Sequence, residues 1–150
     1  MVFTIPGIRG TIRVHNQRTA AWLRRTYRDA LRGDAEAQWH IGVQLKSADH
    51  PGLLPVDDHA AFKWLVRAAR GGATAGWSQV ACAYKDGIGV RRDRKKAFAL
   101  VYASALEGDL ASMMNVGRFY RDGIGVKRDV AHGVAILEDV VNRGFTFAAY

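Results

Sequence analysis

Small and apolar residues recur along the chain at helical spacing, in two patterns that alternate. In the first pattern they stand at positions i, i+4, i+5 and i+8, which share one face of a helix. It occurs three times: at Ala37, Ile41, Gly42 and Leu45, at Gly76, Val80, Ala81 and Tyr84, and at Ser112, Val116, Gly117 and Tyr120. The second pattern has positions i, i+1, i+4 and i+8: Ala61, Phe62, Leu65 and Ala69, Ala97, Phe98, Val101 and Ala105, and Gly133, Val134, Leu137 and Val141. The alternation predicts three pairs of short helices, each with one apolar face.

Residues that favour helix ends stand at the borders of these patterns. An Asp precedes each copy of the second pattern: Asp57, Asp93 and Asp129. Its carboxylate can accept a hydrogen bond from a free backbone N–H of the first turn and complement the helix dipole. Glycine follows each pair: Gly71 or Gly72, then Gly108 and Gly144. A glycine there can take the positive φ that often ends a helix, so each pair is expected to form an α-hairpin.

The helix pairs belong to an internal repeat. Residues 84–93 read YKDGIGVRRD and residues 120–129 read YRDGIGVKRD, which are identical at eight of ten positions at a spacing of 36 residues. Aligning the glycines gives repeats at residues 33–71, 72–107 and 108–144, of which the first has a longer loop. The sequence therefore predicts an all-α fold, an α-solenoid of about three stacked helix-turn-helix repeats.

The two ends of the chain fall outside the repeats. Residues 1–32 are expected to form a basic N-terminal arm and a capping helix, which docks through Trp22, Leu23, Tyr27 and Leu31. Ahead of that helix, VFTI and TIRV flank PGIRG, which predicts either a short β-hairpin or an extended arm. Residues 145–150, FTFAAY, form a C-terminal tail. This tail either covers the last helix pair or leaves an end that is open to self-association.

These residues resemble the Sel-one-like repeat family, a branch of the tetratricopeptide superfamily. The resemblance rests on GDAEAQWHIG at residues 33–42, on GDLASMMNVG at residues 108–117 and on the two Y-x-D-G-I-G-V-x-R-D loops. It implies a right-handed solenoid of helix pairs. The chain departs from the family pattern in the first repeat, which has KSADHPGLLPV in place of the G-x-G loop, and at Gly133, where Ala is usual.

Composition narrows the cellular setting. A chain of 150 residues with 49% hydrophobic content can bury one core. Its apolar runs are too short to cross a bilayer, and residues 1–15 contain no uninterrupted apolar stretch of the signal-peptide type. The single cysteine, Cys82, allows no intrachain disulfide and favours a reducing compartment. We expect a cytoplasmic protein that does not associate with a membrane.

The residue patterns of common catalytic and metal sites are missing from the sequence. The five histidines show neither HExxH nor the Cys/His spacing of zinc sites, and no Ser stands in a G-x-S-x-G elbow. The two GIG loops superficially resemble phosphate-binding loops. However, neither follows a strand or completes G-x-G-x-x-G, so we interpret them as turns between helices. We expect a protein that is not an enzyme and has no cofactor or metal.

Two large apolar residues mark one candidate binding surface. Trp77 and Met113 stand five residues after the opening glycine of the second and third repeats, where the first repeat has Gln38 and the family usually has a polar residue. First helices of such arrays line an inner groove, so the two side chains are predicted to form an apolar ridge there. The surrounding candidates are His40, Gln79, Asn115 and Arg118. The alternative is that both large side chains pack into the core.

Positive charge is concentrated at the N-terminal end. Residues 1–32 contain seven Arg and one acidic residue, Asp29, and so carry +6 of the net charge of +8. Arg24, Arg25 and Arg28 on the predicted capping helix are candidates for binding an acidic partner. The alternative is a polar cap that keeps the end of a solenoid in water.

The sequence thus favours a non-catalytic protein-protein interaction module, an adaptor or inhibitor with an acidic protein partner. The family resemblance implies the same class, because small bacterial members act as adaptors, regulators or host-interaction factors, and some as immunity proteins that neutralise a toxin. The alternative is a nucleic-acid-binding accessory protein that uses the Arg-rich N-terminus and RRDRKK at residues 91–96. No base-reading module supports that alternative.

Overall fold

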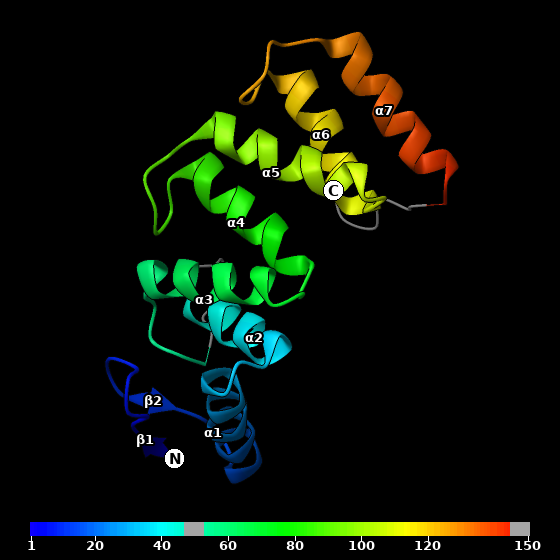
Figure 1. The fold of residues 1–150 in the computed structure, drawn as a ribbon. Coiled ribbons are helices and arrows are strands. Elements are labelled where there is room, and N and C mark those ends of the chain that lie inside the picture. The colour runs from blue at the N-terminus through cyan, green and yellow to red at the C-terminus, as the bar shows by residue number, and fades with distance from the viewer. Residues whose placement is uncertain (47–52, 145–150) are drawn as a thin grey trace. The chain divides into compact units, whose positions relative to one another are not determined.

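The computed structural model describes residues 1–46 and 53–144, so the predicted tail at residues 145–150 lies outside the described residues. Within them the fold is helical, with one small antiparallel sheet (Figure 1). The elements are β1 (Val2–Phe3), β2 (Ile12–Arg13), α1 (Gln17–Leu31), α2 (Ala35–Leu45), α3 (Asp58–Arg70), α4 (Ala75–Asp86), α5 (Arg94–Leu106), α6 (Leu110–Asp122) and α7 (Val130–Asn142). The predicted helix pairs and the capping helix are confirmed. Of the two predictions for the N-terminus, the β-hairpin is correct.

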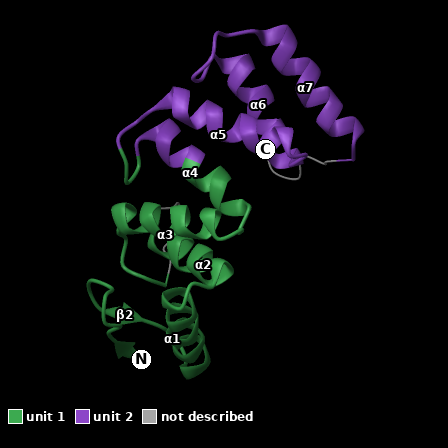
Figure 2. Cartoon of the chain, in the orientation of Figure 1, with its two compact units in different colours: residues 1–80, 88–90 green, residues 81–87, 91–150 purple. Residues whose placement is uncertain are grey.

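The chain divides into two compact units (Figure 2). Unit 1 comprises residues 1–80 and 88–90, and unit 2 comprises residues 81–87 and the chain from Arg91 onward. Helix α4 therefore begins in unit 1 and ends in unit 2.

Side-chain caps determine where the second helix of each pair begins. Asp57, Asp93 and Asp129 each accept a hydrogen bond of 3.0 Å from the backbone N–H three residues later, as predicted. At the end of α3, Gly72 has a φ of +102°, whereas Gly71 is the C-cap residue with a φ of −82°. Gly72 is therefore the residue that needs the conformational freedom of glycine.

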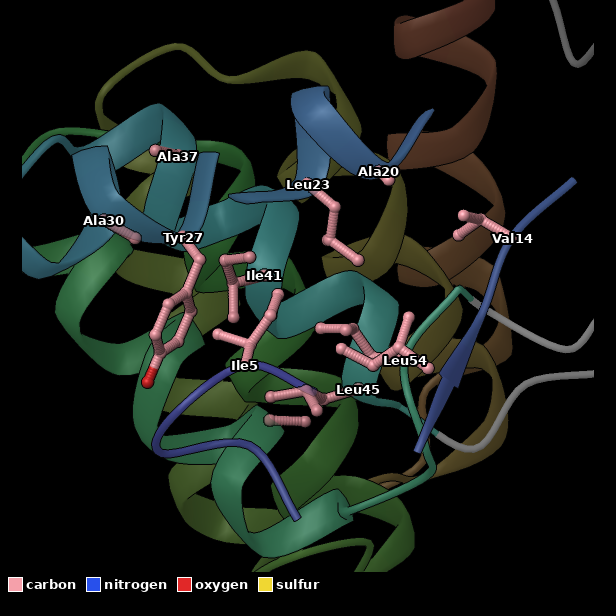
Figure 3. Packing of buried hydrophobic residues seen from close by; sticks show 12 residues of the cluster. Ile5, Val14, Ala20, Leu23, Tyr27, Ala30, Ala37, Ile41, Leu45 and Leu54 are labelled. Atoms are coloured by element: carbon pink, nitrogen blue, oxygen red, sulfur yellow. The ribbon is translucent and has the colours of Figure 1, made fainter. Parts of the chain in front are cut away.

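Unit 1 has α2 packed against both α1 and α3. Leu23 of α1 and Ile41 of α2 have no exposed surface and lie in the same apolar cluster (Figure 3). A Cβ built on Gly42 would overlap the side chain of Leu65 on α3. The small residue predicted at this position thus allows α2 and α3 to approach closely.

The N-terminal hairpin is held in place by the core of unit 1. Val2 lies opposite Arg13 and Phe3 opposite Ile12. Ile5 and Ile12 are buried in the same cluster as the apolar residues of α1 and α2. A two-stranded hairpin is marginally stable alone, so this burial is what allows so short a sheet to form.

Two apolar residues of α1 are less buried than predicted. Leu23 and Tyr27 are buried, but Trp22 is 40% exposed and Leu31 is 62% exposed. The buried stripe of α1 advances in steps of three or four residues through Leu23 and Tyr27. Trp22 and Leu31 each lie one residue away from this stripe, which turns them about 100° from it.

Unit 2 has α6 packed against both α5 and α7. Its buried cluster consists of Ala81, Ala97, Val101, Val116 and Phe119. A Cβ built on Gly117 would press on Leu137, and one built on Gly133 would overlap the backbone of Gly117 and Arg121. The close contact of α6 with α7 therefore explains why the last repeat has glycine at residue 133, where the family usually has Ala.

The apolar stripe of the last helix is largely exposed. Val134 is 38% exposed and Val141 is 45% exposed, although both belong to the pattern that predicted an apolar packing face. On α5 the equivalent of Val134 is Phe98, whose ring centroid lies 6.4 Å from that of Phe119 and 5.4 Å from that of Tyr120 on the next helix. No described helix follows α7, so no such neighbour covers this stripe in the described chain.

Candidate functional site

The predicted basic residues lie on the exposed side of α1, in unit 1. The guanidinium carbon of Arg24 lies 4.4 Å from the centroid of the Phe3 ring. Arg25 Nε lies 3.9 Å from a carboxylate oxygen of Asp29, a surface pair of little energetic weight. Asp29 is the single acidic residue among the first 32. The positive charge of Arg28 and of the other arginines nearby is therefore largely uncompensated.

A cleft of about 450 Å³ lies between the N-terminal segment and α1. Its lining residues are Thr4, Ile5 and Pro6, and Arg24, Tyr27, Arg28, Leu31 and Arg32. The three arginines are spaced four residues apart, so they follow one side of the helix. The cleft therefore combines apolar surface with three cationic groups.

Tyr27 is fixed at this cleft by packing. Its ring meets the ring of Trp64 in a T-shaped contact with centroids 6.0 Å apart. A Cβ built on Gly7 would overlap the Tyr27 hydroxyl, so the turn of the hairpin lies directly against it. Burial raises the pKa of the Tyr27 phenol above its ordinary value of 10.0, although the charge of Arg67 opposes this. The hydroxyl therefore stays neutral at physiological pH.

His40 is half-buried among aromatic rings where α1 meets α2. Its ring centroid lies 5.9 Å from that of Trp22 and 5.0 Å from that of Trp39. Its Nε2 atom lies 3.8 Å from a carboxylate oxygen of Glu36, which attracts it when the imidazole is protonated. The buried indole N–H of Trp39 has no hydrogen-bond partner among the described residues. The predicted candidate His40 thus belongs to an aromatic cluster of unit 1.

The repeat position shared by Gln38 and Trp77 is not open surface in the first repeat. Gln38 is 8% exposed, and its Nε2 donates a hydrogen bond of 3.1 Å to the carbonyl oxygen of Ala30 at the end of α1. Trp77 is half-buried at the start of α4. Two residues later, Gln79 Oε1 accepts a hydrogen bond of 2.7 Å from Lys46 Nζ. In the first repeat, the polar side chain at this position therefore hydrogen-bonds to the C-terminal end of α1 instead of facing water.

The remaining candidates lie in unit 2. Met113, Asn115 and Arg118 are half-buried on α6. Trp77 lies in unit 1 and Met113 in unit 2, so the two units hold one each of the residues expected in the apolar ridge. A shared ridge of these two side chains stays a prediction.

An ion pair of α6 lies one turn beyond Arg118. Asp122 accepts hydrogen bonds of 2.8 Å from Arg121 Nε and 3.0 Å from Arg121 Nη2. These hydrogen bonds lower the pKa of the Asp122 carboxyl, as do the charges of Arg121, Arg128 and Arg118. The three arginines and the one aspartate of this group together carry a net positive charge.

Among residues 1–46 and 53–144, no group of three His, Cys, Asp or Glu side chains is arranged to hold a metal ion. None of the helices described is both long and apolar enough to cross a membrane.

Comparison with known families decides the relationship of the repeats. The model of the Sel1 repeat matches residues 35–72, 78–109 and 110–138, which together make up more than half of the chain. The chain belongs to the Sel1 repeat family. Sel1 repeat proteins are in general protein-interaction modules with a non-catalytic scaffold fold. The resemblance inferred from the glycine-rich loops and helix patterns is therefore confirmed.

Solved structures of Sel1 repeat proteins share the fold. A protective antigen of uropathogenic Escherichia coli strains, which displays an SLR fold, is 28% identical with a TM-score of 0.69 over 82% of this chain and 26% of that chain. A Sel1 repeat protein from Oxalobacter formigenes is 25% identical with a TM-score of 0.72, over 87% of this chain and 36% of that chain. Cysteine-rich protein B of Helicobacter pylori is 17% identical with a TM-score of 0.59, over 82% of this chain and 89% of that chain. At this identity the similarity shows the fold alone.

The chain thus spans about a quarter of the length of the first of these proteins and about a third of the second. A search of curated proteins found no match.

Sequence reasoning missed several residues of the cleft. Arg32 follows Arg24 and Arg28 at the same four-residue step, so helical spacing alone could have added it to the candidates. Ile5 and Pro6 line the cleft because the N-terminal hairpin docks on α1. No local pattern in the sequence predicts that the hairpin docks on α1.

Proposed function

We propose that this Sel1 repeat chain is a non-catalytic protein-interaction module, an adaptor or inhibitor, that binds an acidic protein through the basic surface of α1. One observation carries the proposal: residues 1–32 contain seven Arg and a single acidic residue, Asp29, which already lies beside Arg25. Arg24 and Arg28 are exposed on the same helix. An acidic partner surface would relieve the repulsion between these charges and speed association.

A bacterial immunity protein that neutralises an acidic toxin is the concrete inhibitor that we propose, with the cytoplasm as its compartment. The charge of α1 supports an acidic target, and the single Cys82 supports a reducing compartment. In this role Trp77 would add an apolar contact to the charged one.

As a separate proposal, the chain self-associates: the exposed side of α7 binds a second copy of the chain. Val130, Val134 and Val141 are exposed along one side of this helix. Helix α7 contains no Lys or Arg, so the repulsion between the arginines of α1 does not arise here, and the exposed acidic residue beside the valines is Glu138.

Affinity capture from the native lysate tests the main proposal. The tagged chain should retain a stoichiometric acidic protein after nuclease treatment, and the triple variant Arg24→Glu, Arg25→Glu and Arg28→Glu should lose it. The matched control replaces three exposed cations of unit 2, as Arg91→Glu, Lys95→Glu and Lys127→Glu, and should keep it. Recovery of nuclease-sensitive material alone would contradict the proposal and favour the nucleic-acid alternative.

A further inference from the structure

The arginines of the cleft between the N-terminal hairpin and α1 form a row of like charges. Arg24, Arg28 and Arg32 follow one another at four-residue steps along the helix, which sets successive residues about 6 Å apart along its axis. Like charges at this spacing destabilise a helix. In residues 1–46 and 53–144 no carboxylate forms an ion pair with any of the three. Such a row of cations suits a ligand that carries several negative charges.

The other side chains of the cleft call for an apolar group in the same ligand. Ile5 and Pro6 come from the N-terminal segment, and Leu31, which is 62% exposed, comes from α1. The volume of about 450 Å³ lies within the range of roughly 300–1,000 Å³ that is typical of small-ligand sites. The cleft can therefore receive one or two side chains of a ligand, and an apolar side chain there would shield Leu31 from water.

We propose that this cleft binds a short acidic segment of the partner protein, in which one bulky apolar side chain is flanked by Asp or Glu residues. The apolar side chain packs on Ile5, Pro6 and Leu31, and the carboxylates pair with Arg28 and Arg32. Guanidinium groups bind carboxylates strongly because both are charged and planar. The inference rests on the proposed function and deepens it, since it names the part of an acidic partner that α1 recognises.

Two other anionic ligands fit this site less well. A fatty acid has one carboxylate, whereas the row from Arg24 to Arg32 extends over about 12 Å of helix. Nucleic acid would supply several phosphates, but single strands are held largely by bases that stack on exposed aromatic faces. The aromatic ring of this cleft, Tyr27, is buried against Trp64. An acidic peptide matches both the charged and the apolar residues.

Selection from a displayed library of acid-biased 12-residue peptides tests the inference. The immobilised full chain is panned, with the double variant Arg28→Gln and Arg32→Gln as the counter-selection target. Enriched peptides are then measured by fluorescence anisotropy at two salt concentrations. The matched control is Arg13→Gln with Arg18→Gln, which removes the same charge from exposed positions outside the cleft. Circular dichroism checks that each variant keeps its helices.

We expect enrichment of peptides with at least two acidic residues around a Leu, Phe or Trp. The Arg28→Gln and Arg32→Gln pair should weaken binding about tenfold, and the control pair less than about threefold. Replacing the apolar residue of the peptide by Ser, or Leu31 by Ser, should also weaken it. The inference would be overturned by equal losses of affinity in both double variants, by affinity that does not depend on the apolar residue, or by a lack of enrichment. It would also be overturned if laurate or a 20-nucleotide thymidine strand displaced the peptide at lower concentration.

The library result and the lysate capture separate the two proposals. If capture of an acidic protein depends on the basic face of α1 but survives Arg28→Gln with Arg32→Gln and Leu31→Ser, the function stands and the cleft is the wrong site. If the selected peptides bind the cleft but no acidic protein is captured, the binding chemistry stands and the proposed function fails.

Discussion

Gly125, in the loop after α6, lies directly against the backbone carbonyl oxygen of Arg94 in the first turn of α5. A Cβ on Gly125 would overlap that oxygen, and the glycine has a φ of +68°. The same relationship joins Gly89 to Asp58 within unit 1. The second glycine of each GIG loop is thus a packing point where the loop meets the preceding second helix of the array. This role, and not phosphate binding, explains why the loop repeats.

Replacing Gly125 by Ala should therefore destabilise the protein more than an ordinary glycine substitution. We expect a loss of about 3 kcal/mol in the free energy of unfolding, about 1 kcal/mol from the positive φ and the rest from the overlap with backbone. Gly108→Ala is the matched control, because Gly108 also has a positive φ but no atom lies near its missing Cβ. Urea unfolding of both variants measures the difference, and equal losses would contradict the packing role.

Trp77→Ala separates the two interpretations of the Trp77 side chain. If Trp77 contacts the partner, as proposed, the variant should bind the captured protein at least tenfold more weakly while losing less than about 2 kcal/mol of folding stability. Titration calorimetry with the captured partner and urea unfolding provide the two numbers. Ser78→Ala, on the next residue of α4, should change neither. A loss of 3 kcal/mol or more with unchanged affinity, on the order of a core Trp substitution, would assign Trp77 to the core.

Val134→Glu tests the proposed self-association at α7. Light scattering coupled to gel filtration should show the average mass of the unaltered chain rising with concentration, and the variant should remain a monomer because two carboxylates would face each other in the dimer. Ala135→Glu places the same charge on an exposed residue of α7 that is turned about 100° or more from the valine stripe, and should alter the mass less. If the unaltered chain stays monomeric at every concentration, self-association at α7 is ruled out.

The ion pair of Asp122 with Arg121 should make a small contribution to stability that depends on pH. The folded-state pKa of Asp122 is lowered, so the contribution is complete above the unfolded-state value of about 3.9 and is lost as the pH falls through the lower folded-state value. Because the pair is exposed, Asp122→Asn should cost less than about 1 kcal/mol at pH 7. Urea unfolding at pH 7 and pH 2.5 should show the difference shrinking. A cost that is independent of pH would mean that the charge is not its source.

Local patterns in the sequence predicted most of the fold because repeats are built from local contacts. Asp57, Asp93 and Asp129 could be assigned as caps from their spacing to the next apolar stripe, and the structure confirms each hydrogen bond. The exposure of Val134 could not be predicted in this way. Its place in the repeat is the same as that of Phe98, but a following helix covers Phe98 and, within the described residues, none covers Val134.

The candidate site was less predictable because it depends on contacts between distant segments. Gln38 matches a polar position of the repeat, yet its side chain is buried and donates to the carbonyl oxygen of Ala30, which also accepts a hydrogen bond from the Gly33 N–H. Spacing along α1 identifies Arg28 and Arg32 as neighbours but does not reveal a cleft beside them. That cleft exists only because Ile5, more than twenty residues earlier in the chain, packs against the same helix.

Helix α4 and the loop after it have a consequence for how this protein can be cut or recombined. The chain leaves unit 1 after Val80, returns for Ile88–Val90 and leaves again at Arg91. Gly89 anchors the returning segment, since it packs on Asp58 and its carbonyl oxygen lies 3.3 Å from His59 Nδ1. A single break in the backbone therefore separates neither unit intact. A fragment that ends at Val80 lacks residues 88–90 of unit 1, and one that ends at Val90 includes residues 81–87 of unit 2. A graft of these repeats onto another array should accordingly not be joined at Val80 or Val90, where the boundaries of the compact units lie.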